Sequence, residues 1–181
     1  MINKLRKIVS DMYIKRLVQR GLKLGENVDF EKGVNIDANF PWLIEIEDNV
    51  VLSPWVYILS HDSSSKSLTG LMKIGKVSIG KNTFIGARSI IMPGTKIGKN
   101  CVIGANSIVT RDIPDNSVAV GNPARVISTI DEYKDKLHTE CDNYGLIYSR
   151  SFTLWGGVDD KKKEKMQEEI IEVAFVDADH F

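Results

Sequence analysis

A six-residue repeat of aliphatic residues runs through the middle of this 181-residue sequence and constrains its fold more than any other feature. The clearest part lies between Val77 and Val126. The aliphatic positions recur every six residues, at Ile79, Ile85, Ile91, Ile97, Ile103 and Val109. Four of them precede glycine, and the first five are each followed four positions later by a small residue: Thr83, Ser89, Thr95, Cys101 and Ser107.

A six-residue unit fits one short strand and one tight corner. Side chains alternate across a strand, so an aliphatic and a small residue two positions apart can both point inward. Three such units would make a triangular coil, and stacked coils would form parallel sheets with a spacing of about 4.8 Å per coil. An amphipathic helix would instead show apolar residues at i, i+3, i+4 and i+7, which this stretch lacks.

The repeat is interrupted twice. It begins with Leu24, Phe30 and Ile36, breaks at 37–45, resumes with Ile46, Leu52 and Ile58, and breaks again at 62–73. Extra residues cannot fit within a stacked coil, so both segments are expected to project outward as loops. Loops on a rigid scaffold are frequent places for functional sites.

Both ends of the chain depart from the repeat. Residues 2–20 predict a helix with an apolar stripe and a basic face; the stripe consists of Ile2, Leu5, Ile8, Val9, Met12, Leu17 and Val18. Packing across the end of the coils is the preferred interpretation, and lying on an anionic membrane is the alternative. Residues 128–141 and 161–173 predict helices, and this C-terminal extension is expected to cap the last coil.

Composition limits the range of functions. The formal net charge is zero, which gives no argument for binding nucleic acid or an anionic membrane. Cys101 and Cys141 make no disulfide framework, and Cys101 occupies a small inward slot. No stretch predicts a membrane span or a signal peptide, so a cytoplasmic protein is expected.

His61 is the one histidine of the repeat region and lies between the two breaks. An imidazole can take a proton near neutral pH, although a single histidine is more often structural. Asp62, the next residue, is a candidate to orient His61, with a solvated loop carboxylate as the equal alternative.

The run IGKNTFIGARSIIMPGTKIGKNCVIGANSIVTRDIPDNSVAVGNPARVI resembles the hexapeptide-repeat acyltransferases, in particular the galactoside, maltose and capsular-polysaccharide O-acetyltransferases. This resemblance covers about residues 24–128. It implies a mainly β fold, a left-handed parallel β-helix, and a homotrimer with acetyl-CoA and acceptor between subunits. The left hand follows from the family alone, since most parallel crossovers are right-handed. The expected domains are an N-terminal helix (1–21), the β-helix (22–128) and an extension (129–181).

The resemblance also assigns roles to individual residues. His61 falls where the family has its catalytic histidine, and Asn39 resembles a residue that contacts the reacting centre; a turn before Pro41 is its alternative role. Phe84 replaces a tryptophan that walls in the histidine. The expected contacts to acetyl-CoA come from Ala87, Ala105, Thr110 and Arg125, with Arg125 at the nucleotide. Family members related to the galactoside transferases carry an acidic acceptor-binding residue shortly after the asparagine that Asn39 resembles; this chain is shorter there, and its equivalent is not placed.

These features together predict transfer of an acetyl group from acetyl-CoA to a sugar hydroxyl, with His61 as general base and without an acyl-enzyme or a metal. Substrate contacts are expected from Asn39, Asp62 and Phe84. N-acetylation of an amino sugar and a non-catalytic trimeric scaffold are the alternatives. A zinc carbonic anhydrase on the same scaffold would need several histidines and is disfavoured.

Overall fold

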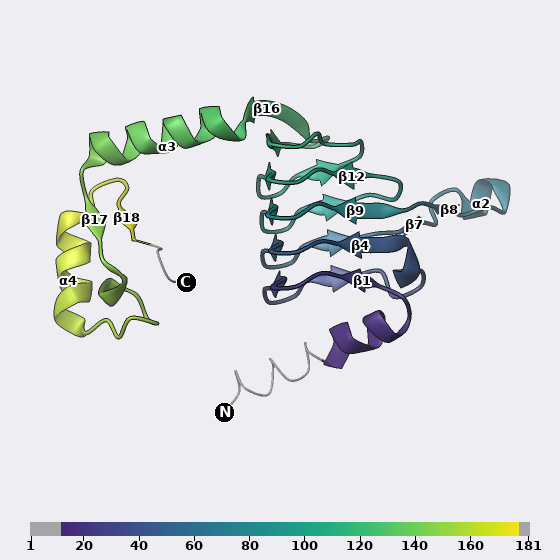
Figure 1. The fold of residues 1–181 in the computed structure, drawn as a ribbon, viewed down its shortest axis with the longest axis horizontal. Coiled ribbons are helices and arrows are strands. Elements are labelled where there is room, and N and C mark those ends of the chain that lie inside the picture. Colours follow the sequence, from purple (N-terminus) through teal and green to yellow (C-terminus); the bar gives the residue numbers. More distant parts are fainter. Residues whose placement is uncertain (1–11, 178–181) are drawn as a thin grey trace. The chain divides into compact units, whose positions relative to one another are not determined.

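The computed structural model describes residues 12–177. The chain divides into two compact units, Met1–Ile130 and Asp131–Phe181. The first is built from three parallel sheets that form the three sides of a prism. Figure 1 shows its coils stacked one above another.

Sheet A has four strands, in the spatial order β1 (Lys23–Leu24), β4 (Ile44–Ile46), β9 (Val77–Ile79) and β12 (Lys96–Ile97). Sheet B has six, in the order β16 (Arg125–Thr129), β15 (Ser117–Val120), β13 (Val102–Ile103), β10 (Phe84–Ile85), β5 (Val51–Leu52) and β2 (Asp29–Phe30). Sheet C has four, in the order β14 (Ile108–Val109), β11 (Ile90–Ile91), β6 (Tyr57–Ile58) and β3 (Asn35–Ile36). Neighbouring strands of these sheets are parallel except β15 and β16, which pair antiparallel. The predicted parallel β-helix is confirmed.

The aliphatic residues of the repeat fill the inside of the prism. The register places Ile46, Ile79 and Ile97 side by side in sheet A, so each coil lays its inward residue on the same position of the next. All six aliphatic positions from Ile79 to Val109 are fully buried. Burial of one such side chain contributes about 1.5–3 kcal/mol, and the stacked columns therefore form the main source of stability.

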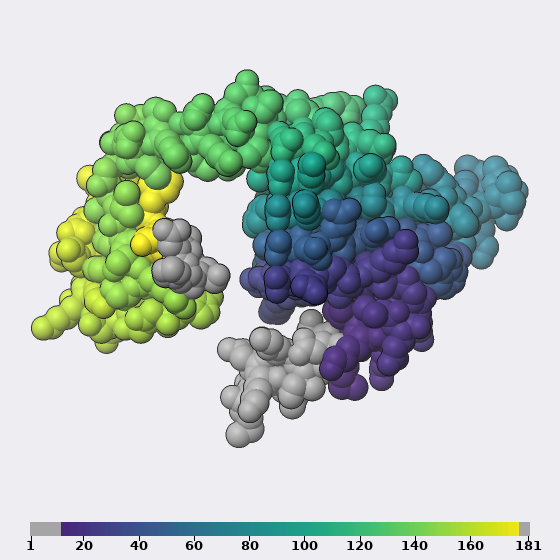
Figure 2. All heavy atoms as spheres, viewed as in Figure 1, coloured from purple at the N-terminus to yellow at the C-terminus, as the bar shows by residue number. Residues whose placement is uncertain are grey.

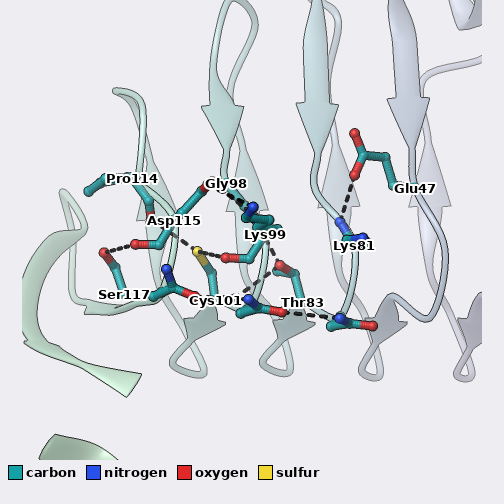
Figure 3. A network of polar contacts seen from close by, with 12 residues as sticks. Glu47, Lys81, Thr83, Gly98, Lys99, Cys101, Pro114, Asp115 and Ser117 are labelled. Carbon is teal, nitrogen blue, oxygen red and sulfur yellow. Dashed lines mark hydrogen bonds and ion pairs between the residues drawn. The ribbon is translucent and has the colours of Figure 1, made fainter. Parts of the chain in front are cut away.

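The small residues of the repeat are buried, and four of the five, Thr83, Ser89, Cys101 and Ser107, bond a backbone group of a neighbouring coil. Figure 3 shows Thr83 and Cys101. The Thr83 hydroxyl donates to the Gly98 carbonyl at 3.0 Å and accepts from the Cys101 N–H at 3.2 Å. The Cys101 thiol in turn donates to the Pro114 carbonyl at 3.1 Å. A small polar side chain thus satisfies a backbone group of the next coil, which a larger apolar residue would leave unpaired.

Five stacked asparagines form the corner between sheets A and B. All five have a positive φ between 53° and 57°, a region that asparagine tolerates better than most residues. Their side-chain amides form a ladder along the prism, each donating to the next at 2.8–3.3 Å: Asn27, Asn49, Asn82, Asn100 and Asn116. The sequence pattern alone did not reveal this second column.

The second break in the repeat forms an arm that leaves the prism. β7 (His61–Asp62) and β8 (Lys73–Ile74) pair antiparallel, and α2 (Lys66–Thr69) forms their tip. Figures 1 and 2 show this segment standing out from the stacked coils. The first break is shorter and contains the 3-10 helix η1 (Pro41–Leu43).

The N-terminal helix is described over residues 12–19, so the predicted stripe positions from Ile2 to Val9 lie outside the described residues. Leu17 is buried as predicted, but Met12 and Val18 are exposed. Tyr13 and Ile14 pack against the core instead. The predicted stripe is therefore wrong at two positions, because the buried face is centred on Tyr13 and Leu17, four residues apart.

The second unit contains the helices α3 (Ile130–Tyr144) and α4 (Asp160–Glu169), the 3-10 helix η2 (Arg150–Phe152), and a parallel strand pair, β17 (Ile147–Tyr148) and β18 (Phe175–Val176). α4 begins at Asp160 because the Asp159 carboxylate caps the Lys162 N–H at 2.8 Å. Two helices were predicted here, but the strand pair was not. Between residues 12 and 177, no helix has the length and apolar character needed to cross a membrane.

The asparagine ladder allows a test of the corner geometry. Asn100→Ala should lower the free energy of unfolding by about 1–3 kcal/mol, because alanine disfavours a positive φ and breaks two ladder bonds. Asn100→Gly restores the backbone freedom and should lose less. Urea unfolding of the three proteins measures both contributions, and an Asn100→Ala protein as stable as the wild type would contradict the prediction.

Candidate active site

His61 and the first break of the repeat meet at one end of sheet C. Asp37 directly follows β3, and Ser60 and His61 follow β6, the strand beside it. Because the two strands are parallel and in register, the chain leaves the prism at the same corner in both coils. Both breaks of the repeat therefore begin at this place.

The Asp37 carboxylate is the centre of this corner. One oxygen, Oδ2, contacts His61 Nδ1 and accepts from the Ser60 hydroxyl at 2.7 Å and the Ser60 N–H at 3.1 Å. The other oxygen, Oδ1, accepts from the Asn39 N–H at 2.9 Å. Asp37 is only 5% exposed, so one buried carboxylate joins the histidine to the loop of the first break.

The electrostatics of Asp37 favour the ionised form. Burial acts against the charge, but the hydrogen bonds from Asn39, His61 and Ser60 outweigh it and bring the pKa of the carboxyl below its ordinary value. An ionised carboxylate can only accept hydrogen bonds. His61 Nδ1 must therefore carry the proton in this contact.

This contact selects the tautomer of His61. With the proton on Nδ1, the neutral ring presents an unprotonated Nε2. Within residues 12–177, no side chain or backbone group hydrogen-bonds Nε2. The His61 side chain is 23% exposed, so the ring is held by one nitrogen and accessible to solvent. A ring in this state is suited to act as a general base.

Of the two roles considered for Asp62, the structure shows the loop carboxylate and not a contact with the His61 ring. The Asp62 carboxylate accepts from the Ser64 N–H at 2.8 Å and turns the start of the arm. That hydrogen bond lowers the pKa of the Asp62 carboxyl. Adjacent residues on a strand point to opposite faces, so a carboxylate directly after His61 cannot easily reach its ring. Asp37 fulfils this role from the neighbouring coil.

Asn39 and Phe40 lie beside the histidine. The turn at Asn39 is held by its backbone N–H, which leaves the exposed side-chain amide without a partner among the described residues. Phe40 meets the His61 ring edge-on, with centroids 5.7 Å apart. Phe84 was expected as the apolar wall, but it lies on β10 in sheet B and is 43% exposed. Within one chain, Phe40 provides that wall.

The other predicted residues occupy different edges of the prism. Ala87 and Ala105 follow β10 and β13 at the corner between sheets B and C, where the Asn106 N–H bonds the Ala87 carbonyl at 2.8 Å. Their own N–H groups donate to no acceptor in the described part of the chain. Thr110 is exposed after β14, and Arg125 is exposed on β16, where Nη1 donates to the Ala124 carbonyl at 2.8 Å. One chain thus does not gather all the predicted residues in one place.

Two residues of this site, Asp37 and Phe40, were missed by the sequence analysis. The available signal was the position of Asp37, which opens the first break directly after the inward residue Ile36. No group of three metal-ligating side chains occurs between residues 12 and 177.

Comparison with known proteins places the chain in a family. A family model described as the hexapeptide repeat of succinyl-transferase matches residues 76–111. Protein CapG of Staphylococcus aureus is 37% identical over 146 residues, which cover 76% of this chain and 81% of CapG. This chain belongs to the hexapeptide-repeat acyltransferase family. The predicted class of enzyme is confirmed at this level.

Two solved structures extend the comparison. A maltose O-acetyltransferase from Clostridium difficile 630 is 35% identical, with a TM-score of 0.52 over 62% of this chain and 72% of that chain. A galactoside acetyltransferase in complex with coenzyme A is 32% identical, with a TM-score of 0.54 over 66% and 70%. The left-handed β-helix expected from the resemblance agrees with these neighbours.

The buried carboxylate gives a pH-dependent prediction. The folded protein holds the pKa of Asp37 below the unfolded value of about 3.9, so the carboxylate stabilises the fold above that pH. This contribution is lost as the pH falls through the folded-state pKa. Asp37→Asn should therefore lower the free energy of unfolding by about 1–3 kcal/mol at pH 7, and the difference from wild type should shrink near pH 3.

Asp62→Asn is the matched control, because its exposed side chain can still accept from the Ser64 N–H. It should change stability much less than Asp37→Asn. Urea midpoints at both pH values measure the comparison. Equal losses for the two variants, or a loss at Asp37 that does not vary with pH, would exclude this role of the buried carboxylate.

Proposed function

We propose that this protein is an acetyl-CoA-dependent O-acetyltransferase that acts on a hydroxyl of a saccharide or polysaccharide precursor, with His61 as the general base. The observation that carries the proposal is the Asp37–His61 contact, which leaves Nε2 accessible at the edge of the prism. A trimeric scaffold without catalysis would have no need of a buried carboxylate that fixes a histidine tautomer.

The reaction follows from this geometry. His61 Nε2 takes the proton of the sugar hydroxyl while the oxygen attacks the thioester carbonyl of acetyl-CoA. The carbon–sulfur bond then breaks, and the proton passes from the imidazolium to the leaving thiolate. The products are the acetylated sugar and CoA. The negative Asp37 stabilises the imidazolium that forms between the two proton transfers.

The transfer is direct, without an acyl-enzyme. Cys101 is the one thiol of the coils, and it is 1% exposed with its sulfur bonded to a neighbouring corner. Burial raises the pKa of the Cys101 thiol, which disfavours the thiolate that would act as a nucleophile. The oxyanion of the tetrahedral intermediate needs fixed donors, and the N–H groups of Ala87 and Ala105 are candidates.

The acetyl-CoA site is proposed to run along the corner between sheets B and C. Ala87 and Ala105 would border the pantetheine arm, with Thr110 beside it and Arg125 at the anionic nucleotide. A complex of the galactoside acetyltransferase with coenzyme A supports this class of donor. Because acetyl-CoA is the donor, we place the reaction in the cytoplasm.

A homotrimer is part of the proposal. After a polar residue in the first coil (Asn35 in sheet C, Asp29 in sheet B), the outward residues of these two sheets are apolar: Tyr57, Ile90 and Ile108 in sheet C, and Val51, Phe84 and Val102 in sheet B. Sheet A instead carries Lys23, Glu45, Ser78 and Lys96. Two apolar sides suit contacts with two neighbouring copies. Such contacts would bring Phe84 and the alanine corner of one chain toward His61 of another, which a single chain does not do.

N-acetylation of an amino sugar differs from the proposed O-acetylation in the acceptor atom. An amino sugar would need the same base, so N-acetylation uses the same residues and differs only in the nucleophile. Parallel assays with a sugar that has only hydroxyl groups and with a 2-amino sugar separate the two reactions.

The role of His61 can be tested against a second histidine. His61→Ala should lower kcat by about 10²–10⁴-fold while leaving acetyl-CoA binding close to wild type, since the variant loses the base only. His138→Ala, on α3 in the other unit, should leave both unchanged. Thiol release with a sugar acceptor measures the rate, and calorimetry measures binding. Wild type that binds no acetyl-CoA would refute the transferase itself.

The role of Arg125 concerns the nucleotide. Arg125→Ala should weaken acetyl-CoA binding about tenfold, because a guanidinium makes charge-assisted bonds to phosphate. The same substitution should leave kcat/KM for S-acetylpantetheine, which lacks the nucleotide, unchanged. If Arg125→Ala reduces the use of both donors equally, Arg125 does not act at the nucleotide.

A further inference from the structure

Trp42 is an exposed tryptophan near His61, and Phe40 contacts both rings. The Phe40 ring meets the His61 ring and the Trp42 ring edge-on, each with ring centroids 5.7 Å apart. Trp42 is nevertheless 56% exposed, although a tryptophan buries a large apolar area when the fold uses it for stability. Its ring is therefore presented to solvent on the same corner as the proposed base.

The loop that carries Trp42 is fixed rather than loose. The Leu43 N–H bonds the Phe40 carbonyl at 3.0 Å, and Pro41 at the start of η1 is buried. The Ser60 hydroxyl lies 3.3 Å from the same Phe40 carbonyl, and it also bonds Asp37. The Asp37 carboxylate thus sets the positions of His61 and of the aromatic loop together.

Trp42 packs closely against Gly21, where any larger residue would clash with it. A Cβ atom at Gly21 would lie 2.9 Å from the Trp42 Cβ, and Gly21 has a φ of 103° that side chains rarely adopt. The helix that precedes β1 therefore ends in a residue that lets the tryptophan stand beside it. This close approach fixes the backbone and Cβ of Trp42, so ordering the side chain on a bound ligand costs little conformational entropy.

The loop that carries Trp42 is uncharged. Between Asp37 and Glu45 the sequence is Ala-Asn-Phe-Pro-Trp-Leu-Ile, which contains no ionisable side chain. The Asn39 amide is the exposed polar group of this segment. An amide beside an aromatic surface suits a ligand with one apolar face and several hydroxyl groups, and a pyranose ring has this chemistry.

We propose that Trp42 is the aromatic platform on which the pyranose ring of the acceptor stacks, so that a hydroxyl of that ring reaches His61. This assignment rests on the proposed function and specifies its acceptor as a sugar recognised by a C–H face rather than by a carboxylate.

The first arm of the test compares acceptors. Trp42→Ala should lower kcat/KM about tenfold for maltose and for methyl β-D-galactopyranoside, because stacking on an aromatic ring is lost. It should leave kcat/KM for glycerol, a hydroxyl acceptor without a ring, and KM for acetyl-CoA unchanged. Trp42→Phe keeps an aromatic face and should recover most of the loss. Trp155→Ala, at a tryptophan that is 78% exposed in the other unit, is the matched control and should have no effect.

The second arm measures sugar binding without turnover. The chain has three tryptophans, so Trp55→Phe combined with Trp155→Phe leaves Trp42 as the sole indole. Its fluorescence should change in a saturable way with methyl β-D-galactopyranoside or maltose, and glycerol should cause no such change. This reading remains valid if the chain transfers no acetyl group, so the platform and the transferase can fail separately.

Several outcomes would overturn the platform. Trp42 would be structural if Trp42→Ala lost activity equally with glycerol and with the sugars. It would also be structural if Trp42→Ala, but not Trp42→Phe, altered the circular dichroism spectrum and no sugar changed the fluorescence. A change of oligomeric state in Trp42→Ala would instead make it a contact between copies of this chain. If the wild type binds anionic vesicles and Trp42→Ala does not, Trp42 is a membrane contact.

Discussion

Each coil of this protein must hydrogen-bond the next one in register, and this constraint decides what every position can be. An aliphatic residue that points inward lies on its equivalent one coil away, so the columns contain isoleucine, leucine and valine almost throughout. The corners must turn sharply enough to keep the strands aligned. Asparagine with a positive φ does so at five levels, and its amide joins the levels at the same time.

The same constraint creates the corner of the candidate active site. Residues in excess of the six-residue period have to leave the prism, and two adjacent coils release them from the same end of sheet C. Asp37 and His61 therefore meet although they are 24 residues apart in the chain. A carboxylate that is buried by the stacked coils can fix the ring, while the ring itself remains at the surface. The shared corner of the two coils thus explains both why the His61 ring is held by Asp37 and why it remains accessible to solvent.

The sequence predicted the features that depend on local periodicity. The inward columns, the buried small residues and both interruptions were visible as a six-residue pattern. Asp37 and the asparagine ladder were missed because their partners lie one coil away, and contacts between coils depend on register rather than on neighbours in the chain. Asp62 was a plausible partner of His61 by proximity in sequence, but strand alternation directs it elsewhere. The strand pair of the C-terminal unit joins Ile147 to Phe175, a separation that no local pattern reveals.

The arm and the loop of η1 emerge from a scaffold whose coils do not change when these segments change. The inward columns, the ladder and the alanine corner are built by residues of the coils rather than by these two segments. Selection can therefore revise what the protein recognises without altering the machinery that would hold the donor. In such a fold, the exposed residues of the two projecting segments can vary with little effect on the stacked coils, whereas the buried Asp37 and Pro41 at their base cannot.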